Sequence, residues 1–349
     1  MARLYYFKGA KPNFGDELNP WLWPRLLPNL LDDNDDELFL GIGTILNDGV
    51  PAPPRKIVFG SGFGYGLPPH VDSAKWNIYC VRGPLTAHTL GLPEELAVCD
   101  PAILLRRQPW PTQNKQYHAS FMPHWESLSR GNWPQACAEA DIHFIDPTAP
   151  IEQVVIEIRG SELLITEAMH GAIVADAMRV PWVPVQPQLH MHSPKWLDWC
   201  ASVEVPYQPQ QLHASSFIES TNAAYRRARQ HVSRTARTIK QQLRRRRSQL
   251  ATPAEQNAPP NASTTTRANT LRILEILVEH PAAAMADAIP RSFKTQIDET
   301  FIQAAARDLR SVCNLRPSSS TDATIERLTQ RLETCLESVK KHSVPGRPS

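Results

Sequence analysis

The sequence predicts an α/β protein with two doubly wound, Rossmann-like domains that face each other across a cleft. Short apolar runs alternate with helix-like segments through two successive blocks, residues 1–108 and 109–215, as in parallel sheets covered by helices. Residues 106–116 contain two prolines and few apolar side chains, which is typical of a linker. Beyond the two blocks we expect a long basic helix, a flexible linker and a small all-α tail, over residues 216–250, 251–266 and 267–342.

The first block contains five strand-like apolar runs, over residues 4–7, 38–46, 56–64, 76–82 and 98–105. Helix-like segments begin at Phe14 and Pro84. Two of the runs lead into glycine-rich turns, one of them at Gly60 and Ser61. Such turns can cradle a phosphate or a sugar, but no dinucleotide-binding glycine pattern leads from a strand into a helix here.

The second block repeats the pattern and places four polar side chains at the ends of strands: His124, Glu126, Asp146 and His170. The carboxyl ends of parallel strands lie at one edge of a sheet, where open α/β sheets bind their ligands. The sequence therefore predicts that these four groups converge on one crevice.

His170 is the strongest candidate in the chain for proton-transfer chemistry. Thr166 is expected to cap a helix that follows a short strand, which places His170 in the first helical turn. The free N–H groups of such a turn can bind an anion, and Gly171 leaves room beside the imidazole. Glu167, three residues earlier, is expected to orient the ring. The alternative is that His170 only caps a packed helix.

Positive charge is concentrated in one segment. Ten of the 37 Lys and Arg residues lie between Tyr225 and Gln249, which leaves 27 basic residues against 35 acidic ones elsewhere. This distribution favours one docking surface over a generally nucleic-acid-binding fold, so we expect no nucleic-acid partner. The cluster Arg244–Arg247 is a candidate contact with an anionic membrane surface. The alternative for this amphipathic segment is packing against the two domains.

Six cysteines without a C-x-x-C spacing, and no apolar run long enough to span a bilayer, predict a cytoplasmic protein that is at most peripheral to the membrane. His190 and His192 have a metal-ligand spacing, but no third ligand is nearby, so no metal site is expected. Apolar residues three or four apart predict helices over residues 271–278, 293–312 and 325–339, which suit a small bundle or homo-oligomer contacts.

Five motifs in order make the chain resemble the polysaccharide pyruvyl transferases, and within them the succinoglycan-type exopolysaccharide enzymes. The motifs are Phe14–Glu17, Val58–Gly62, Val81–Pro84, Asp100–Ala102 and Glu167–Gly171. The resemblance covers about residues 1–215. It implies transfer of the enolpyruvyl group of phosphoenolpyruvate onto two hydroxyls of a sugar, in a polysaccharide or its lipid-linked precursor, to form a pyruvate ketal. It also implies a fold similar to the B-type glycosyltransferases, with phosphoenolpyruvate as a co-substrate and no further cofactor.

The resemblance assigns roles to the residues singled out above. His170 is expected to act as the catalytic acid or base, with Glu167 beside it. Fixed cations and N–H groups must meet the two anionic groups of the donor. The expected donor-binding residues are Arg82, Thr166, Gly171, Gly60 and Ser61, and the expected acceptor-binding residues are Asp16, His124 and Glu126.

One position departs from the family pattern. Many relatives carry an arginine two residues before the motif histidine, where this chain has Ala168. Another cation must then meet the donor's charge. Arg82 matches a family position, and the alternatives are Arg159, Arg179 and Lys8.

Two other functions fit parts of the sequence. A glycosyltransferase of the same shape would use a nucleotide sugar, but residues 182–192 offer no obvious acid to hold a ribose. A non-catalytic scaffold protein would work through the basic helix and the helical tail, and Ala168 favours this alternative. Replacing His170 with alanine would distinguish the two classes, because only an enzyme would lose turnover.

Overall fold

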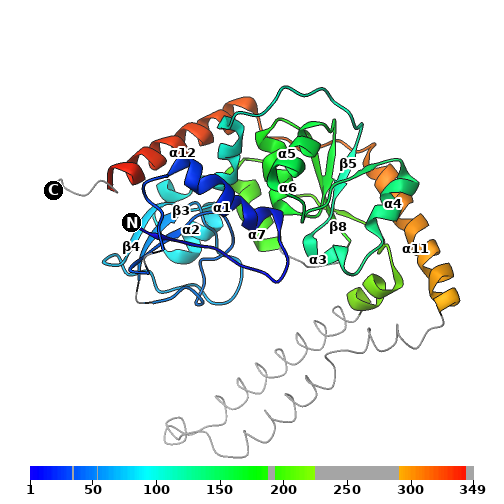
Figure 1. Ribbon diagram of the computed structural model, residues 1–349, viewed down its shortest axis with the longest axis horizontal. Coiled ribbons are helices and arrows are strands. Elements are labelled where there is room, and N and C mark those ends of the chain that lie inside the picture. The colour runs from blue at the N-terminus through cyan, green and yellow to red at the C-terminus, as the bar shows by residue number, and fades with distance from the viewer. Residues whose placement is uncertain (34, 53, 188–192, 225–290, 343–349) are drawn as a thin grey trace, which may run out of the picture. The chain divides into compact units, whose positions relative to one another are not determined.

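The computed structural model describes residues 1–33, 35–52, 54–187, 193–224 and 291–342 of the 349-residue chain (Figure 1). The chain forms two units. The first consists of Met1–Ser129, Trp133–Leu212 and Ala305–Ser349, and it contains both sheets; the second consists of Arg130–Asn132 and His213–Ala304. The predicted α/β class with parallel sheets is confirmed within the first unit.

The first sheet has four parallel strands in sequence order: β1 (Arg3–Tyr5), β2 (Glu37–Leu40), β3 (Arg55–Phe59) and β4 (Trp76–Cys80). Helices α1 (Phe14–Leu26) and α2 (Pro84–Leu90) follow β1 and β4. The strand β3 is shorter than its apolar run because Gly60 adopts φ +79°, a conformation that side-chain-bearing residues rarely reach. The loop after β3 therefore begins at Gly60, where the sequence predicted a turn.

One predicted strand of the first block is wrong. Residues 101–107 form a 3₁₀ helix, η2 (Pro101–Arg107), and the run before it makes a single parallel bridge, between Val81 and Ala97. The side chain of Asp100 accepts a hydrogen bond from the Ala102 N–H at 3.0 Å, and Pro101 fixes the backbone of the first helical residue. This capping overrides the apolar run. A second short 3₁₀ helix, η1 (Glu94–Leu96), precedes it.

The second sheet has five parallel strands in the order β6 (His143–Phe144), β5 (Ser120–Met122), β7 (Leu164–Thr166), β8 (Trp182–Gln186) and β9 (Gln210–Gln211). Its helices are α3 (Trp125–Leu128), α4 (Trp133–Ala140), α5 (Ile151–Arg159), α6 (Met169–Ala177) and α7 (Ser193–Ser202). Helix α6 is buried on every side except at His170. An apolar helix of this kind belongs in the core, so its one partly exposed side chain, the His170 imidazole, stands out.

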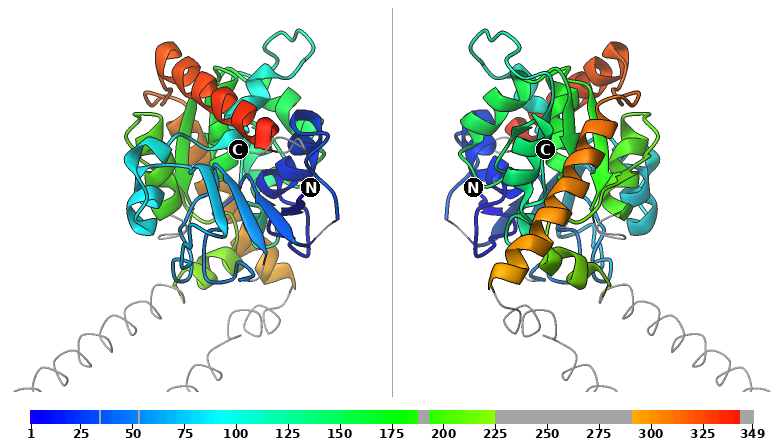
Figure 2. Two further views of the ribbon diagram at one scale, coloured as in Figure 1. Left: turned by 90° about the vertical axis from the view of Figure 1, so that its left-hand side faces the viewer. Right: turned by 90° about the vertical axis from the view of Figure 1, so that its right-hand side faces the viewer.

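The C-terminal residues belong to the same unit as the sheets. Two predicted helices of the tail exist, as α11 (Arg291–Val312) and α12 (Asp322–His342). Helix α12 packs on β4 and η2, as Figures 1 and 2 show in red beside the first sheet. Its buried face is formed by residues three or four apart: Ile325, Leu328, Leu332, Leu336 and Val339. That spacing predicts the helix but does not specify which surface covers it.

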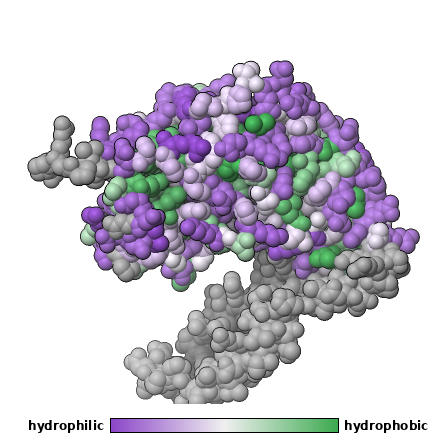
Figure 3. Space-filling model, viewed as in Figure 1, coloured by the Kyte–Doolittle hydropathy of each residue, from purple (hydrophilic) through white to green (hydrophobic). Residues whose placement is uncertain are grey.

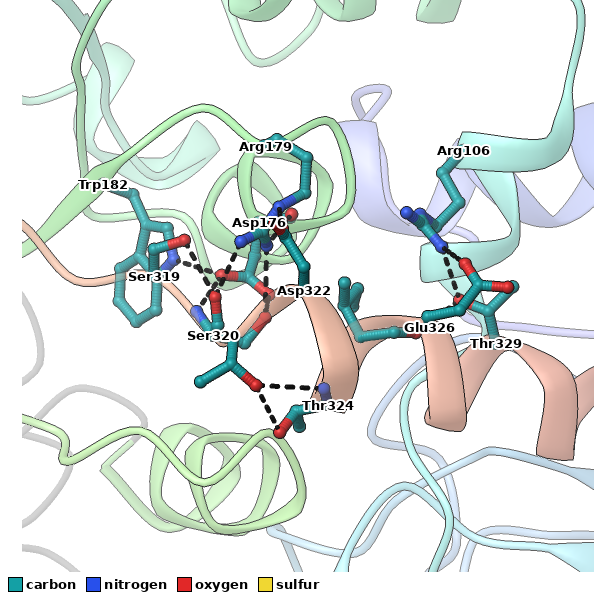
Figure 4. A network of polar contacts seen from close by, with 12 residues as sticks. Arg106, Asp176, Arg179, Trp182, Ser319, Ser320, Asp322, Thr324, Glu326 and Thr329 are labelled. Atoms are coloured by element: carbon teal, nitrogen blue, oxygen red, sulfur yellow. Dashed lines mark hydrogen bonds and ion pairs between the residues drawn. The ribbon is translucent and has the colours of Figure 1, made fainter.

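A polar network holds the segment before α12 on the second sheet (Figure 4). Buried Asp176 on α6 accepts hydrogen bonds from the Ser320 N–H at 2.7 Å and from Trp182 Nε1 at 3.1 Å. At the surface, Arg179 Nε lies 2.8 Å from Asp322, and Arg106 pairs with Glu326 at 2.5 Å. The network therefore runs from the second sheet to the η2 side of the first.

Replacing Asp176 with alanine is expected to lower the free energy of unfolding by about 2–4 kcal/mol, because buried donors lose their acceptor. Urea unfolding would measure this. The matched control is Asp322→Ala, whose carboxylate is 91% exposed and should contribute less than about 1 kcal/mol. Equal, small losses in both variants would show that Asp176 does not anchor the segment.

Several sequence predictions lie wholly or partly outside the described residues. Of the predicted basic helix, residues 217–224 are helical, and Arg244–Arg247 lie outside the described part. The same holds for the predicted linker and for the helix over residues 271–278. Figure 3 shows a mostly hydrophilic face with apolar residues in small, separate patches. Within the described residues, no helix has the length and apolar character that crossing a membrane requires.

Candidate functional site

A pocket of about 450 Å³ lies where strand ends of both sheets meet. Its lining comes from the segments after β1, β2, β3 and β5 and from the first turns of α1, α6 and α7. The charged and titratable side chains that line it include Asp16, His124, Glu126, His170 and Lys195. Three of the four predicted strand-end groups therefore share one pocket. Asp146 does not line it; its carboxylate accepts hydrogen bonds from Thr148 in a turn.

Buried hydrogen bonds position the first-sheet side of this pocket. The amide of Asn19 on α1 donates to the Ile42 carbonyl and accepts from the Ile42 N–H, both at 2.9 Å. This pair ties α1 to the loop after β2. The Phe14 N–H donates to the Pro147 carbonyl at 2.9 Å, so the start of α1 is also held by the loop after β6.

His170 faces a buried carboxylate that sequence reasoning did not single out. Its Nε2 lies 3.5 Å from Asp100 Oδ2, and Asp100 is fully buried as the cap of η2. Neither of these two atoms has a hydrogen-bond partner among the described residues. A donor hydrogen on Nε2 would point at a carboxylate oxygen that needs one. Seventy residues separate the two, and the only sequence signal was the Asp100-Pro101 motif.

The other side of the His170 ring rests against Gly15. A Cβ at Gly15 would lie 1.9 Å from His170 Nδ1 and 2.6 Å from Cγ, so only glycine allows this contact. The ring is thus held between the first turn of α1 and the start of η2. The imidazole therefore connects α6, which packs on the second sheet, with two elements of the first block, and it lines the pocket.

Glu167 contacts a different group from the one we expected. Its Oε2 accepts a hydrogen bond from the His124 N–H at 2.8 Å, which fixes the loop after β5. Helix α6 begins at Met169, so Glu167 precedes it and the helical spacing to His170 does not apply. The carboxylate recorded at His170 Nε2 is that of Asp100.

Thr166, at the end of β7, and Gly171, in α6 beside His170, do not line the pocket. The cap residue of α6 is Ala168, so the prediction that Thr166 caps it is wrong. The buried Thr166 hydroxyl instead accepts from the Ala168 N–H at 3.0 Å and closes the turn after β7. A Cβ at Gly171 would lie 2.8 Å from Thr166 Oγ1, so this glycine lets the helix approach the strands.

Gly60, Ser61 and Arg82 serve the packing of the first sheet. The space beside Gly60 is filled by Pro101, and the buried Ser61 hydroxyl donates to the Gly41 carbonyl. Arg82 is fully buried: Nε lies 2.9 Å from Asp198 Oδ2, Nη1 donates to Thr44 and Nη2 to the Phe63 carbonyl. None of the three lines the pocket. The donor-binding role of Gly60, Ser61 and Arg82 stays a prediction, and these contacts do not favour it.

Lys195, at the start of α7, is a cation of the pocket that sequence reasoning missed. Burial, and then the nearby charge of Arg82, lower the pKa of Lys195 to about 8, while Asp16, Glu167 and Glu126 act in the opposite direction. The three other suggested cations do not line this pocket: Arg159 donates to Pro111, Arg179 pairs with Asp322, and Lys8 lies over the Tyr6 ring. The sequence signal that could have found Lys195 is its place in the first turn of the helix that follows β8.

The pocket is also lined by aromatic rings and by the Asp16 carboxyl. Tyr6, Phe7, Tyr65 and Trp125 line it, and Phe7 and Tyr65 are 55% and 41% exposed. Burial raises the pKa of the Asp16 carboxyl, which accepts a hydrogen bond from Asn13 Nδ2 at 2.6 Å. In the described part of the chain, no three His, Cys, Asp or Glu side chains gather as a metal site; His190 and His192 lie outside that part.

Comparison with known proteins identifies the family that this chain matches. A family model described as "Polysaccharide pyruvyl transferase" matches residues 5–188. The chain is 43% identical over 219 residues to the succinoglycan biosynthesis protein ExoV of Rhizobium meliloti (strain 1021), a match that covers 62% of this chain and 69% of that protein. No solved structure matches the chain. The family match includes Gly15, Asp100 and His170 but ends before Lys195.

Proposed function

Because the chain belongs to the polysaccharide pyruvyl transferase family, and is therefore a transferase, we propose that it moves the enolpyruvyl group of phosphoenolpyruvate onto two hydroxyls of one sugar residue. Protonation of the donor's methylene carbon makes C2 electrophilic, and the first hydroxyl adds there. The second hydroxyl then displaces phosphate from C2. The products are a cyclic pyruvate ketal with a new methyl group and one inorganic phosphate.

The observation that carries this proposal is the placement of His170 between Asp100 and Gly15 on the pocket floor. Both the protonation of carbon and the attack of a hydroxyl need a group that exchanges protons near neutral pH, and imidazole suits this task. Asp100 would hold the proton on Nε2 and so fix the tautomer and the orientation of the ring. This is the division of labour between a proton-transfer residue and its orienting carboxylate.

The remaining pocket groups suit a saccharide acceptor. Asp16 and Glu126 can accept hydrogen bonds from sugar hydroxyls, and His124 can donate or accept. The rings of Tyr6 and Tyr65 offer flat apolar faces of the kind that pack against the C–H face of a pyranose. A pocket with a few convergent polar groups among aromatic ones is a usual binding site for a small polar ligand.

Phosphorus NMR tests the proposal. The protein is mixed with phosphoenolpyruvate and, in turn, with galactosyl, glucosyl and mannosyl acceptors. We expect inorganic phosphate to form only when a suitable acceptor is present. If no acceptor releases phosphate and the donor does not raise the melting temperature, phosphoenolpyruvate is not the donor.

The acceptor of the proposed reaction is a lipid-linked saccharide at the cytoplasmic face of a membrane, which the cluster Arg244–Arg247 would help the protein reach. The full chain is expected to float with vesicles that contain anionic lipid and to remain at the bottom with neutral vesicles. A variant with these four arginines replaced by glutamine should lose most of that binding, since each cation contributes about 1 kcal/mol near an anionic surface. Identical flotation of both proteins would exclude this contact.

A further inference from the structure

The donor of the proposed reaction carries more negative charge than the pocket residues predicted from the sequence can balance. Phosphoenolpyruvate has a phosphate and a carboxylate, and Asp16 and Glu126 line the same pocket. These carboxylates would repel the donor. Arg82, the cation we expected to help, is buried against Asp198 and does not line the pocket. A further cation is needed.

Lys195 has the position that this task requires. It is the third residue of α7 and lines the pocket together with His170, and the helices that carry the two residues follow the adjacent parallel strands β8 and β7 of the second sheet. The helix that carries it is firmly anchored, because Trp196 and Trp199 are buried and their rings pack against Trp182, with centroids 6.1 and 5.2 Å away. Asp198, on the same helix, is held by Arg82. Lys195 therefore extends from a helix whose position is fixed by core packing.

We propose that Lys195 binds the anionic donor in this pocket, as the charge-balancing cation of the site. The inference rests on the proposed function for the identity of the donor. An ammonium group binds a phosphate as a point charge and tolerates several geometries, unlike a guanidinium fork. Lys195 would thus act in binding and leave proton transfer to His170.

The charge of Lys195 makes the inference testable through pH. With its pKa lowered to about 8, the side chain is an ammonium below that pH and a neutral amine above it. The groups that act on it are Arg82, Asp16, Glu167 and Glu126. Arginine stays charged and carboxylates are ionised through this range. Donor affinity should therefore fall as pH rises through 8, by up to about tenfold per pH unit.

Titration calorimetry with phosphoenolpyruvate, at pH 7 and pH 9, tests this on the full-length protein. For the natural protein we expect the Kd to rise between the two pH values by up to about tenfold. Lys195→Met should raise the Kd at pH 7 by about tenfold or more and remove the pH dependence. Lys195→Arg should keep the affinity at both pH values. Lys75→Met, at an exposed lysine before β4, is the matched control and should change nothing.

Steady-state kinetics separates binding from chemistry. Lys195→Met should raise the KM for phosphoenolpyruvate while kcat and the acceptor KM change by less than about threefold. An unchanged donor Kd in Lys195→Met, or equal Kd values at pH 7 and pH 9 in the natural protein, would overturn the inference even if phosphate release were normal. Lysine-dependent binding without phosphate release for any acceptor would instead overturn the proposed function and leave the inference standing. A natural protein that binds no phosphoenolpyruvate would overturn both.

Discussion

Replacing His170 with asparagine is expected to lower kcat by about 10²- to 10⁴-fold, the usual contribution of a general acid or base. Asparagine keeps much of the side-chain shape but cannot exchange a proton near neutral pH. The KM for phosphoenolpyruvate should change little, because we propose that Lys195, which also lines the pocket, binds the donor's charge. Acceptor-dependent phosphate release at varied phosphoenolpyruvate concentrations measures kcat and KM, and the melting temperature checks that the variant is folded.

The matched control for this variant is His143→Asn. His143 lies in β6, where its ring stacks on Tyr117 with centroids 3.7 Å apart, and it does not line the pocket. Its replacement should leave kcat unchanged. Retained turnover in the His170 variant would remove proton transfer by this residue from the mechanism.

Replacing Gly15 with alanine is expected to lower kcat by at least about 100-fold, since displacing a reacting group by about 1 Å can cost that much. The new methyl group would lie 1.9 Å from His170 Nδ1, so the ring must leave its place against α1. The backbone of Gly15 does not have the positive φ that excludes alanine, and alanine favours a helix over glycine. The fold should therefore survive better than the activity.

A double-mutant cycle shows whether Gly15 acts through His170. In the His170→Asn background, Gly15→Ala should cause little further loss, because the ring that it displaces is already gone. Equal losses in both backgrounds would mean that the methyl group blocks the substrate directly. Full activity of Gly15→Ala would contradict the contact on which the site is built.

The sequence predicts which strand ends meet better than it predicts the contacts made there. His124, Glu126 and His170 share one pocket because parallel strands bring their carboxyl ends to one edge, a rule that needs only the alternation of strands and helices. Asp16 joins them from the first block. The pairing of Asp100 with His170 joins elements seventy residues apart, and no local periodicity encodes such a pair.

The observed contacts do not favour some of the expected roles, for physical reasons of the same kind. An arginine at a strand end can face a ligand or a buried acid, and Asp198 on α7, 116 residues away, determines which of the two applies to Arg82. Gly60 and Thr166 are near site residues in the sequence, but the contacts they make are packing contacts: Pro101 fills the space beside Gly60, and the Thr166 hydroxyl closes a turn. Lys195 lies at the start of α7, several residues beyond the end of β8, so the sequence does not mark it as a strand-end residue.

The central claim is that the enolpyruvyl group ends as a ketal on the sugar, and carrying out the reaction in D₂O tests it most directly. Protonation of the methylene carbon by a solvent-exchanged group would leave one deuterium in the ketal methyl group. We expect proton NMR and mass spectrometry of the product to show one singly deuterated ketal methyl for each phosphate released. Phosphate release with free pyruvate and an unmodified sugar, or a product that retains the phosphate, would contradict the account.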